Sequence, residues 1–408
     1  MTITSFPKDK INILLLENIH KAAVDKFHKE LFQVEALPGA LDEATLIKKI
    51  AKAHIIGIRS KTQLTPDVLK AGRNLLAVGA FCIGTNQIDL DVAEELGVPV
   101  FNAPFSNTRS VAELIISHCI ALYRGVAEKN VAAHEGKWLK TAEGSHEARG
   151  KTLGVIGYGH IGAQVSVLAE AMGMNVRFYD IVDQLALGNA TRCESLDKLL
   201  QTSDIVTLHV PGTPITKNMM NRETIALMKD GAFLINYSRG DVVDIDALTE
   251  ELKSKRLGGA AIDVFPEEPK TKGDIFRSPL QGMPNVILTP HVGGSTLEAQ
   301  ENIGGEVSQK LIKFINNGST TSAVNVPEVE LPMHEDWHRI LHFHKNKPGV
   351  LQKVNSLFGE KNVNVLGQYL MTNPKVGYLV MDVSKDVDKS MLTEIRKIPE
   401  TIKARILY

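Results

Sequence analysis

The middle of the chain contains a glycine-rich segment that strongly limits the folds it can adopt. Residues 152–157 (TLGVIG) form a short apolar run typical of a buried strand, and a helical pattern follows directly. Gly157, Gly159 and Gly162 have the G-x-G-x-x-G spacing at this junction. The first glycine permits a tight turn, the second lets the backbone approach a pyrophosphate, and the third lets helix and strand pack closely. The pattern predicts a dinucleotide-binding unit.

The next predicted strand, 175–180 (NVRFYD), ends in Asp180. A carboxylate at this place accepts hydrogen bonds from the ribose hydroxyls and repels a 2′-phosphate. The free N–H groups and the positive dipole end of the preceding helix hold the phosphates. Together these features favour NAD over NADP as the cofactor.

Short apolar runs alternate with helical patterns over most of the chain, which predicts an α/β fold with mainly parallel sheets. A second series of strands begins at 152, between two long helical patterns at 108–136 (with a break expected near Gly125) and 295–318. The simplest interpretation is a doubly wound Rossmann domain, 108–295, inserted into a flavodoxin-like domain. The strands of that outer domain, 1–107 and 296–325, are predicted at 11–16, 54–58, 75–80 and 98–102.

The C-terminal part has a different pattern. Residues 326–336 are predicted to form a linker, and 337–408 have strand and helix patterns in the order β-α-β-β-α-β, which predicts a ferredoxin-like α+β domain.

The composition argues against several classes of partner. The 46 basic and 47 acidic residues leave a formal net charge of −1, so neither a nucleic-acid nor a membrane partner is expected. Cys82, Cys119 and Cys193 have no paired spacing, so neither a disulfide framework nor a metal site is expected. The first residues, MTITSFPKDK, lack the apolar core of a signal peptide, and we expect a cytoplasmic protein.

Three residues that follow predicted strands of the inserted domain form a candidate reaction centre. His291 is suited to exchange a proton with an alcohol, and a carboxylate beside it would fix its tautomer. Glu267 and Glu268 are both candidates for that carboxylate. Arg239 could bind a substrate carboxylate with two parallel hydrogen bonds. The residue types predict hydride transfer to or from a small 2-hydroxy acid.

Segments spread over almost the whole chain resemble the D-isomer-specific 2-hydroxyacid dehydrogenase family, in its bacterial form with a C-terminal ACT domain. The resemblance is carried by 57–65 (GIRSKTQLT), 101–114 (FNAPFSNTRSVAEL), 153–162 (LGVIGYGHIG) and 238–244 (SRGDVVD). Further matching segments are GAFCIGTNQIDL (79–90), AAIDVFPEEP (260–269), LTPHVGGST (288–296) and HKNKPGVL (344–351).

The resemblance implies roles for individual residues. The catalytic residues would be Arg239, Glu268 and His291, with Glu268 chosen over Glu267. The NAD contacts would be Gly157, Gly159, His160, Ile161, Gly162, Asp180, Tyr237, Ser238, Arg239, Asp263, His291, Val292, Gly293 and Gly294. The substrate's phosphate and carboxylate end would meet Arg59, Ser60 and Asn107, and Trp138 and Lys140 match a segment that reaches a neighbouring subunit's active site.

The ACT resemblance implies L-serine as a feedback effector, with contacts from His344, Asn346 and Asn364. The C-terminal part of the sequence departs from the family pattern at two places. Lys345 and Lys347 make the effector loop more basic, and the linker 326–336 contains no glycine. Tyr237 stands where the family has a small residue.

The expected activity is NAD-dependent oxidation of 3-phospho-D-glycerate to 3-phosphooxypyruvate, the first step toward L-serine, by a homo-oligomer, most simply a tetramer. A side activity on 2-oxoglutarate is compatible with the same site. Two alternatives remain open: a glyoxylate or hydroxypyruvate reductase, and an NAD-sensing co-regulator without enzyme activity.

Overall fold

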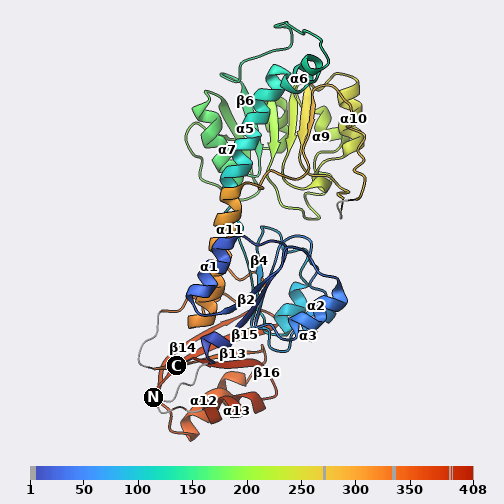
Figure 1. Cartoon of the computed structure of the whole chain (residues 1–408). Helices are drawn as coiled ribbons and strands as arrows, with labels where there is room; N and C mark the ends of the chain where they lie inside the picture. The colour runs from blue at the N-terminus through green and yellow to red at the C-terminus, as the bar shows by residue number, and fades with distance from the viewer. Residues whose placement is uncertain (1–5, 270–272, 333–336, 386, 388, 408) are drawn as a thin grey trace. The chain divides into compact units, whose positions relative to one another are not determined.

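The computed structural model describes residues 6–269, 273–332, 337–385, 387 and 389–407. The chain divides into two compact units (Figure 1). The first combines the residues up to Ser106 with those from Gln300 onward, and the second is Asn107–Ala299. The inserted arrangement expected from the sequence is therefore present, and the C-terminal domain belongs to the first unit.

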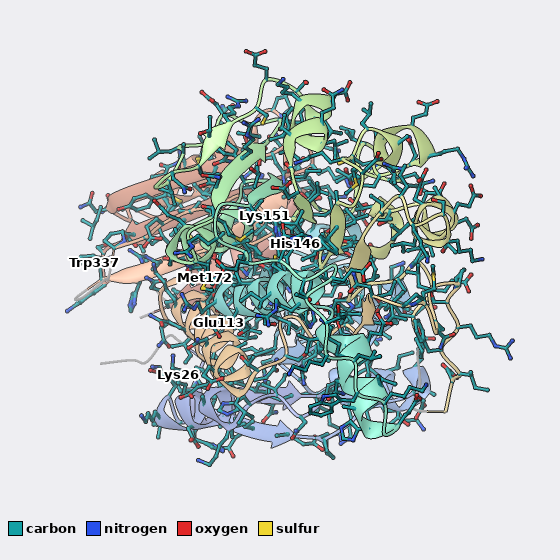
Figure 2. The ribbon with its side chains drawn as sticks, turned by 90° about the horizontal axis from the view of Figure 1, so that it is seen from above. Lys26, Glu113, His146, Lys151, Met172 and Trp337 are labelled. Carbon is teal, nitrogen blue, oxygen red and sulfur yellow. The ribbon has the colours of Figure 1, made fainter. Side chains whose placement is uncertain are left out.

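The first unit contains a five-stranded parallel sheet with the order β2-β1-β3-β4-β5. This is the order of flavodoxin-like domains, the class predicted from the sequence, although β2 itself was not predicted. Helices α2, α3 and α4 cover one face, and α1 and α11 cover the other. Lys26, labelled in Figure 2, belongs to α1, and its Nζ donates to the carbonyl oxygen of Gly305 on α11 at 2.9 Å. The strands are β1 (Asn12–Leu15), β2 (Gln33–Ala36), β3 (Ile55–Ile58), β4 (Ala77–Ala80) and β5 (Val100–Asn102). The helices are η1 (Lys8–Lys10), α1 (Lys21–Lys29), α2 (Glu43–Ile50), α3 (Pro66–Ala71), α4 (Leu90–Glu95) and α11 (Leu297–Asn317).

The second unit is built on a seven-stranded parallel sheet with the order β12-β11-β10-β9-β6-β7-β8. The order runs outward in both directions from β6, as in doubly wound dinucleotide-binding domains. Side chains alternate between two cores: Leu153 and Val155 of β6 face α5 and α7, whereas Ile156 lies in the core with α8 and α10. The strands are β6 (Thr152–Ile156), β7 (Asn175–Tyr179), β8 (Thr191–Arg192), β9 (Ile205–Leu208), β10 (Phe233–Asn236), β11 (Gly259–Ile262) and β12 (Val286–Leu288). The helices are α5 (Thr108–Arg124), α6 (Val126–His134), α7 (His160–Ala171), α8 (Leu196–Thr202), α9 (Arg222–Ala226), α10 (Ile245–Lys253) and η2 (Gly240–Val242).

The long helical pattern at 108–136 breaks at Gly125, as expected. Gly125 has φ 57°, in the left-handed region, and α5 and α6 meet there at a bend of 68°. In the described part of the chain, no single helix is long and apolar enough to cross a membrane. Only α5 and α6 taken together have the length and apolar composition of a membrane span, and they are bent against each other. The apolar face of α5 packs in the core of the second unit.

The C-terminal domain has the predicted β-α-β-β-α-β order and an antiparallel sheet, β14-β15-β13-β16. One face of this sheet, including Phe343 and Tyr378, joins the core of the flavodoxin-like domain, and the other is covered by α12 and α13. Within the predicted linker, Val329 and Leu331 are buried in that same core. The elements are β13 (His338–Lys345), α12 (Val350–Glu360), β14 (Val365–Thr372), β15 (Val376–Val383), α13 (Lys389–Lys397) and β16 (Thr401–Leu407).

Candidate active site

The second unit pairs an imidazole with a carboxylate at the carboxyl edge of its sheet. Nδ1 of His291 lies 2.9 Å from Oε2 and 3.1 Å from Oε1 of Glu268. The carboxylate is itself oriented, because its Oε1 accepts from the backbone N–H of Phe265 at 3.1 Å. In the described part of the chain, the far ring nitrogen of His291, Nε2, has no hydrogen-bond partner, so it can serve a reacting molecule.

The two groups alter each other's ionisation. The hydrogen bond to Glu268 raises the pKa of His291, against the opposing effect of burial and of the Arg239 charge. Burial raises the pKa of Glu268, but the bonds from His291 and from the amide of Phe265, with the nearby positive charges, lower it below its usual value overall. The pair therefore favours an ionised carboxylate beside an imidazole that readily accepts a proton.

Asp263 holds the segment that carries His291. Its carboxylate accepts from the backbone N–H groups of Val292 (2.9 Å) and Gly293 (2.8 Å), and its carbonyl oxygen accepts from His291 N at 2.9 Å. His291 has φ 54°, a left-handed backbone conformation that costs a non-glycine residue energy. The three hydrogen bonds that Asp263 accepts offset that cost and hold the backbone that carries the imidazole.

Arg239 follows β10 in a tightly packed loop. Buried Asn236 organises it: the side-chain amide donates to the carbonyl of Arg239 at 2.9 Å, and Oδ1 accepts from Ser238. A Cβ built on Gly240 would lie 2.0 Å from the carbonyl carbon of Phe265, so the loops that carry Arg239 and Glu268 are in contact. The arginine thus lies close enough to influence the pKa of both His291 and Glu268.

The glycine loop has different requirements at its three positions. Gly157 has φ 89°, and its Cβ would lie 2.6 Å from the carbonyl oxygen of His209. A Cβ on Gly162 would lie 2.2 Å from the carbonyl oxygen of Gly157, so helix and strand require glycine there. Gly159, by contrast, has no atom of the described chain within 4 Å of its Cβ position, which leaves open space above the N-terminus of α7. His160 and Ile161 begin that helix.

Asp180 lies beside this loop. Its carboxylate accepts from the backbone N–H of Tyr158 at 2.7 Å and from that of Val182 at 2.9 Å. These bonds leave further lone pairs for ribose hydroxyls.

Tyr237 links the sheet to α5. Its hydroxyl is hydrogen-bonded to Nδ1 of His118 and lies 3.3 Å from the hydroxyl of Thr289, which in turn donates to Asp263 at 2.5 Å. Burial lowers the pKa of His118, partly opposed by Asp263. The sequence singled out Tyr237 and Asp263 but did not reveal His118, Thr289 or Asn236, because these residues are recognisable only by their contacts.

In the first unit, the loop with Arg59 and Ser60 is held by a carboxylate that the sequence did not reveal. Glu17 is 7% exposed and accepts from the backbone N–H groups of Arg59 (3.2 Å), Lys61 (3.0 Å) and Thr62 (2.8 Å). The side chains of Arg59 and Lys61 make no hydrogen bond or ion pair with the described residues of the chain. The loop therefore presents two uncompensated positive charges.

Asn107 belongs to the second unit. The hypothetical Cβ of Gly294 would lie 2.1 Å from its Nδ2, and its buried Oδ1 has no partner among the described residues. Trp138 and Lys140 lie in an exposed loop of the same unit, with Trp138 85% exposed.

The predicted effector residues do not meet within one chain: His344 and Asn346 lie where β15 begins, whereas Asn364 lies at the opposite end of the sheet, beside Ser384 after β15. Buried His344 is hydrogen-bonded through Nδ1 to the carbonyl of Lys345 at 2.9 Å, and Asn346 donates to the carbonyl of Asn373 at 2.7 Å. Asn364 is exposed just before β14.

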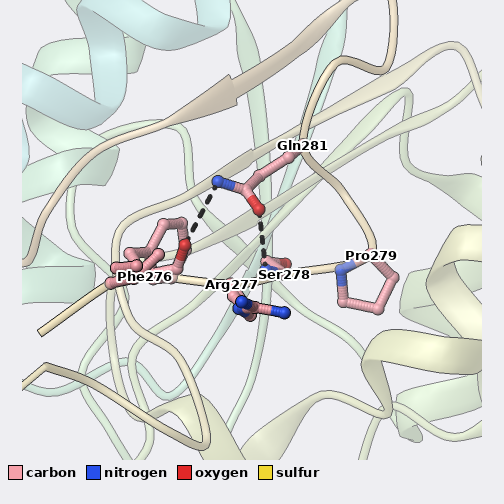
Figure 3. A pocket seen from close by; sticks show the side chains of 6 residues that line it. Phe276, Arg277, Ser278, Pro279 and Gln281 are labelled. Atoms are coloured by element: carbon pink, nitrogen blue, oxygen red, sulfur yellow. Dashed lines mark hydrogen bonds between the residues drawn. The ribbon is translucent and has the colours of Figure 1, made fainter.

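A separate surface hollow lies over the loop 275–281 (Figure 3). Gln281 joins its two sides by accepting from the N–H of Ser278 at 3.1 Å and donating to the carbonyl of Phe276 at 3.5 Å. The predicted catalytic residues do not line it.

Comparison with known proteins agrees with this geometry. Residues 116–293 match the model of the D-isomer specific 2-hydroxyacid dehydrogenase NAD binding domain, and 340–403 match an AHAS small subunit-like ACT domain. The chain is 56% identical over 411 residues to the D-3-phosphoglycerate dehydrogenase of Escherichia coli (strain K12), covering 100% of both chains. It is 51% identical to the enzyme of that name from Dictyostelium discoideum, covering 99% of both.

The fold is also found in solved structures. The D-lactate dehydrogenase of Aquifex aeolicus, crystallised with NAD and lactic acid, matches 75% of this chain and 96% of its own with a TM-score of 0.66 and 29% identity.

Proposed function

Because the chain belongs to the D-isomer-specific 2-hydroxyacid dehydrogenase family, we propose that it oxidises 3-phospho-D-glycerate to 3-phosphooxypyruvate with NAD. This reaction would be the first step of the phosphorylated route to L-serine. The observation that carries the proposal is the His291–Glu268 pair beside Arg239. The full-length similarity to enzymes named for this reaction supports the choice of substrate.

The three residues divide the work on the substrate. Nε2 of His291 removes the proton of the C2 hydroxyl, and Glu268 stabilises the imidazolium that forms. Arg239 binds the C1 carboxylate and stabilises the negative charge on the C2 oxygen. When bound, NAD would supply the acceptor for the hydride that leaves C2. In the reverse direction, the imidazolium returns its proton to the C2 oxygen.

The residues around the glycine loop fit NAD. The open space at Gly159 and the N–H groups that begin α7 suit the pyrophosphate, with His160 and Ile161 beside it. Asp180 suits the ribose hydroxyls and disfavours a 2′-phosphate. We assign the nicotinamide end to the remaining predicted contacts, which are Tyr237, Ser238, Asp263, Val292, Gly293 and Gly294.

We assign the substrate's phosphate to Arg59 and Ser60, with Asn107 at the carboxylate end. The partner-free guanidinium of Arg59 supports this assignment, because a dianion binds best to charged donors that are not already paired.

The regulatory and quaternary parts of the proposal depend on the resemblance. L-Serine would bind at an interface between two ACT domains, with His344 and Asn346 from one and Asn364 from the other, and would inhibit the enzyme. The chain would act in the cytoplasm as a homotetramer, with Trp138 and Lys140 reaching a neighbouring active site. The ACT-like fold of residues 340–403 supports regulation by a small ligand.

The decisive experiment follows NADH oxidation with 3-phosphooxypyruvate, 2-oxoglutarate and hydroxypyruvate in parallel, each with and without L-serine. We expect a clear preference for the phosphorylated substrate, a lower rate on 2-oxoglutarate, and inhibition by serine. Arg59→Ala should raise KM for 3-phosphooxypyruvate and leave KM for hydroxypyruvate unaffected, with Arg73→Ala, at an exposed arginine of the same domain, as the control. Turnover of unphosphorylated acids alone would contradict the proposed substrate.

A further inference from the structure

Two basic side chains meet in a small cavity under the ACT-like sheet. Lys403 and Arg405 are two positions apart on β16, so their side chains lie on the same face of the sheet, and both line the cavity. Its other walls are apolar and come from the flavodoxin-like domain (Leu76 and Phe314) and from β13 (Leu341 and Phe343). All of these residues belong to the first unit, so the cavity lies within one compact body.

No carboxylate balances these two charges. Lys403 donates from Nζ to the carbonyl oxygen of Leu75 at 2.6 Å, and Arg405 donates from Nη2 to that of Ile315 at 3.2 Å. Neither side chain forms an ion pair with a described residue of the chain. Nη1 of Arg405 is buried and has no hydrogen-bond partner. A buried guanidinium N–H without a partner is costly, which points to a missing acceptor.

A neighbouring buried arginine has a carboxylate partner and provides a useful contrast. Arg339 on β13 is buried, makes two bonds to Asp382 (2.6 and 2.8 Å), and donates to the carbonyl oxygens of Asn317 and Pro332. The same fold therefore neutralises one buried arginine with a carboxylate and leaves Lys403 and Arg405 without one.

We propose that Lys403 and Arg405 bind a small monovalent anion of halide size, which bridges the ACT-like domain and the flavodoxin-like domain. The size follows from the cavity, which has room for about one water-sized particle and is too small for phosphate or sulfate. The anion would accept from Nη1 of Arg405 and from Nζ of Lys403. The guanidinium carbon of Arg405 lies 5.6 Å from the centre of the Phe314 ring, which is another wall of the cavity.

The other titratable groups that face the pair do not remove its positive charge. His54 and Tyr378 are close enough to interact electrostatically with Arg405. Burial lowers the pKa of Lys403 to about 7 and that of Arg405 to about 10. Without an anion, Lys403 is therefore half neutral near pH 7, and a bound anion would favour its charged form. Anion binding should consequently weaken as the pH rises above 7.

The direct test uses the unmodified full-length chain, crystallised with bromide in place of chloride. We expect an anomalous bromide peak within hydrogen-bonding distance of Nη1 of Arg405 and Nζ of Lys403. A water molecule or empty density in the cavity, with bromide only at surface positions, would overturn the proposal.

Thermal unfolding provides a second test in solution. At equal ionic strength and pH 6.5, chloride or bromide should raise the unfolding midpoint by about 2–4 °C over gluconate, which is too large to enter. The rise should be smaller at pH 9. Arg405→Met and Lys403→Met should lose the halide-specific rise, and Lys347→Met, at an exposed lysine of the same domain, should keep it. Equal midpoints in all salts for the unmodified chain would contradict the proposal.

Discussion

Nδ1 of His291 lies 2.9 Å from Oε2 of Glu268, although the two residues are 23 positions apart in the sequence. The contact forms because the segments after β11 and β12 leave the same edge of the sheet, and because Asp263 fixes the backbone of His291. The hydrogen bond that His291 donates to Glu268 is the largest cause of the raised pKa of His291. The pH dependence of turnover should therefore depend on this contact.

Glu268→Gln should shift the pH profile of turnover to lower pH. The amide cannot stabilise the imidazolium, so the pKa of His291 falls. Reduction needs the protonated ring and should lose roughly tenfold at pH 8 for each unit of that fall. Oxidation, which needs the neutral ring, should begin its rise at lower pH. The measurement is kcat against pH in both directions. Glu267→Gln is the matched control, and an equal shift in that variant would reject the assignment of Glu268.

His291→Ala should lower turnover by about 10²–10⁴-fold, because it removes the group that exchanges the proton. NADH binding, followed by fluorescence, should change far less than turnover. Near-normal turnover in this variant would show that His291 does not exchange the proton with the substrate.

Gly159→Ala and Gly162→Ala should separate cofactor binding from stability. The new methyl group at residue 162 would lie 2.2 Å from the carbonyl oxygen of Gly157, so this variant should unfold at a lower temperature. At residue 159 the methyl group meets no described atom of the chain, so the thermal unfolding midpoint should stay unchanged. The Kd for NADH should rise, because the methyl group takes up the open space proposed for the pyrophosphate. Calorimetry and NADH titration measure the two effects. Unchanged NADH affinity in Gly159→Ala would argue against a pyrophosphate at this position.

Tyr237→Phe should loosen the segment 291–294, because it removes the bonds to His118 and Thr289. We expect a loss of about 1 kcal/mol in unfolding free energy and a higher KM for NADH. Tyr123→Phe is the matched control, since the buried hydroxyl of Tyr123 has no partner among the described residues. Equal effects in the two variants would show that the hydrogen bonds of Tyr237 have no special importance.

Glu17→Gln should disorder the loop that carries Arg59. The carboxylate now accepts three backbone N–H groups, and its loss should cost about 1–3 kcal/mol of stability. KM for 3-phosphooxypyruvate should rise, whereas NADH affinity should hold. Glu35→Gln, at an exposed ion pair with Lys49, should be nearly neutral in both measurements. An unchanged KM in Glu17→Gln would show that this loop does not bind the substrate.

Strand β2 shows where prediction from the sequence reached its limit. Its residues, Gln33–Ala36, alternate polar and apolar, but the run has only four residues, lies at the sheet edge and contains no fully buried side chain. The other four strands of this sheet were predicted, because each has buried side chains. Similarly, the linker was predicted from its prolines and acidic residues, but Val329 and Leu331 could not be identified as core residues without their partners.

The sequence by itself determined the order of the elements, the insertion of one domain in the other, and the cofactor-binding turn. These features depend on residues close together in the chain, whose periodicity and glycine spacing follow from local geometry. The tertiary structure alone decided that Asp263 holds the backbone of His291, that Glu17 holds the Arg59 loop, and that Lys403 and Arg405 line one cavity without a carboxylate partner. Such contacts join segments far apart in the chain, and the free energy of each depends on burial and on partners that only the packed molecule supplies.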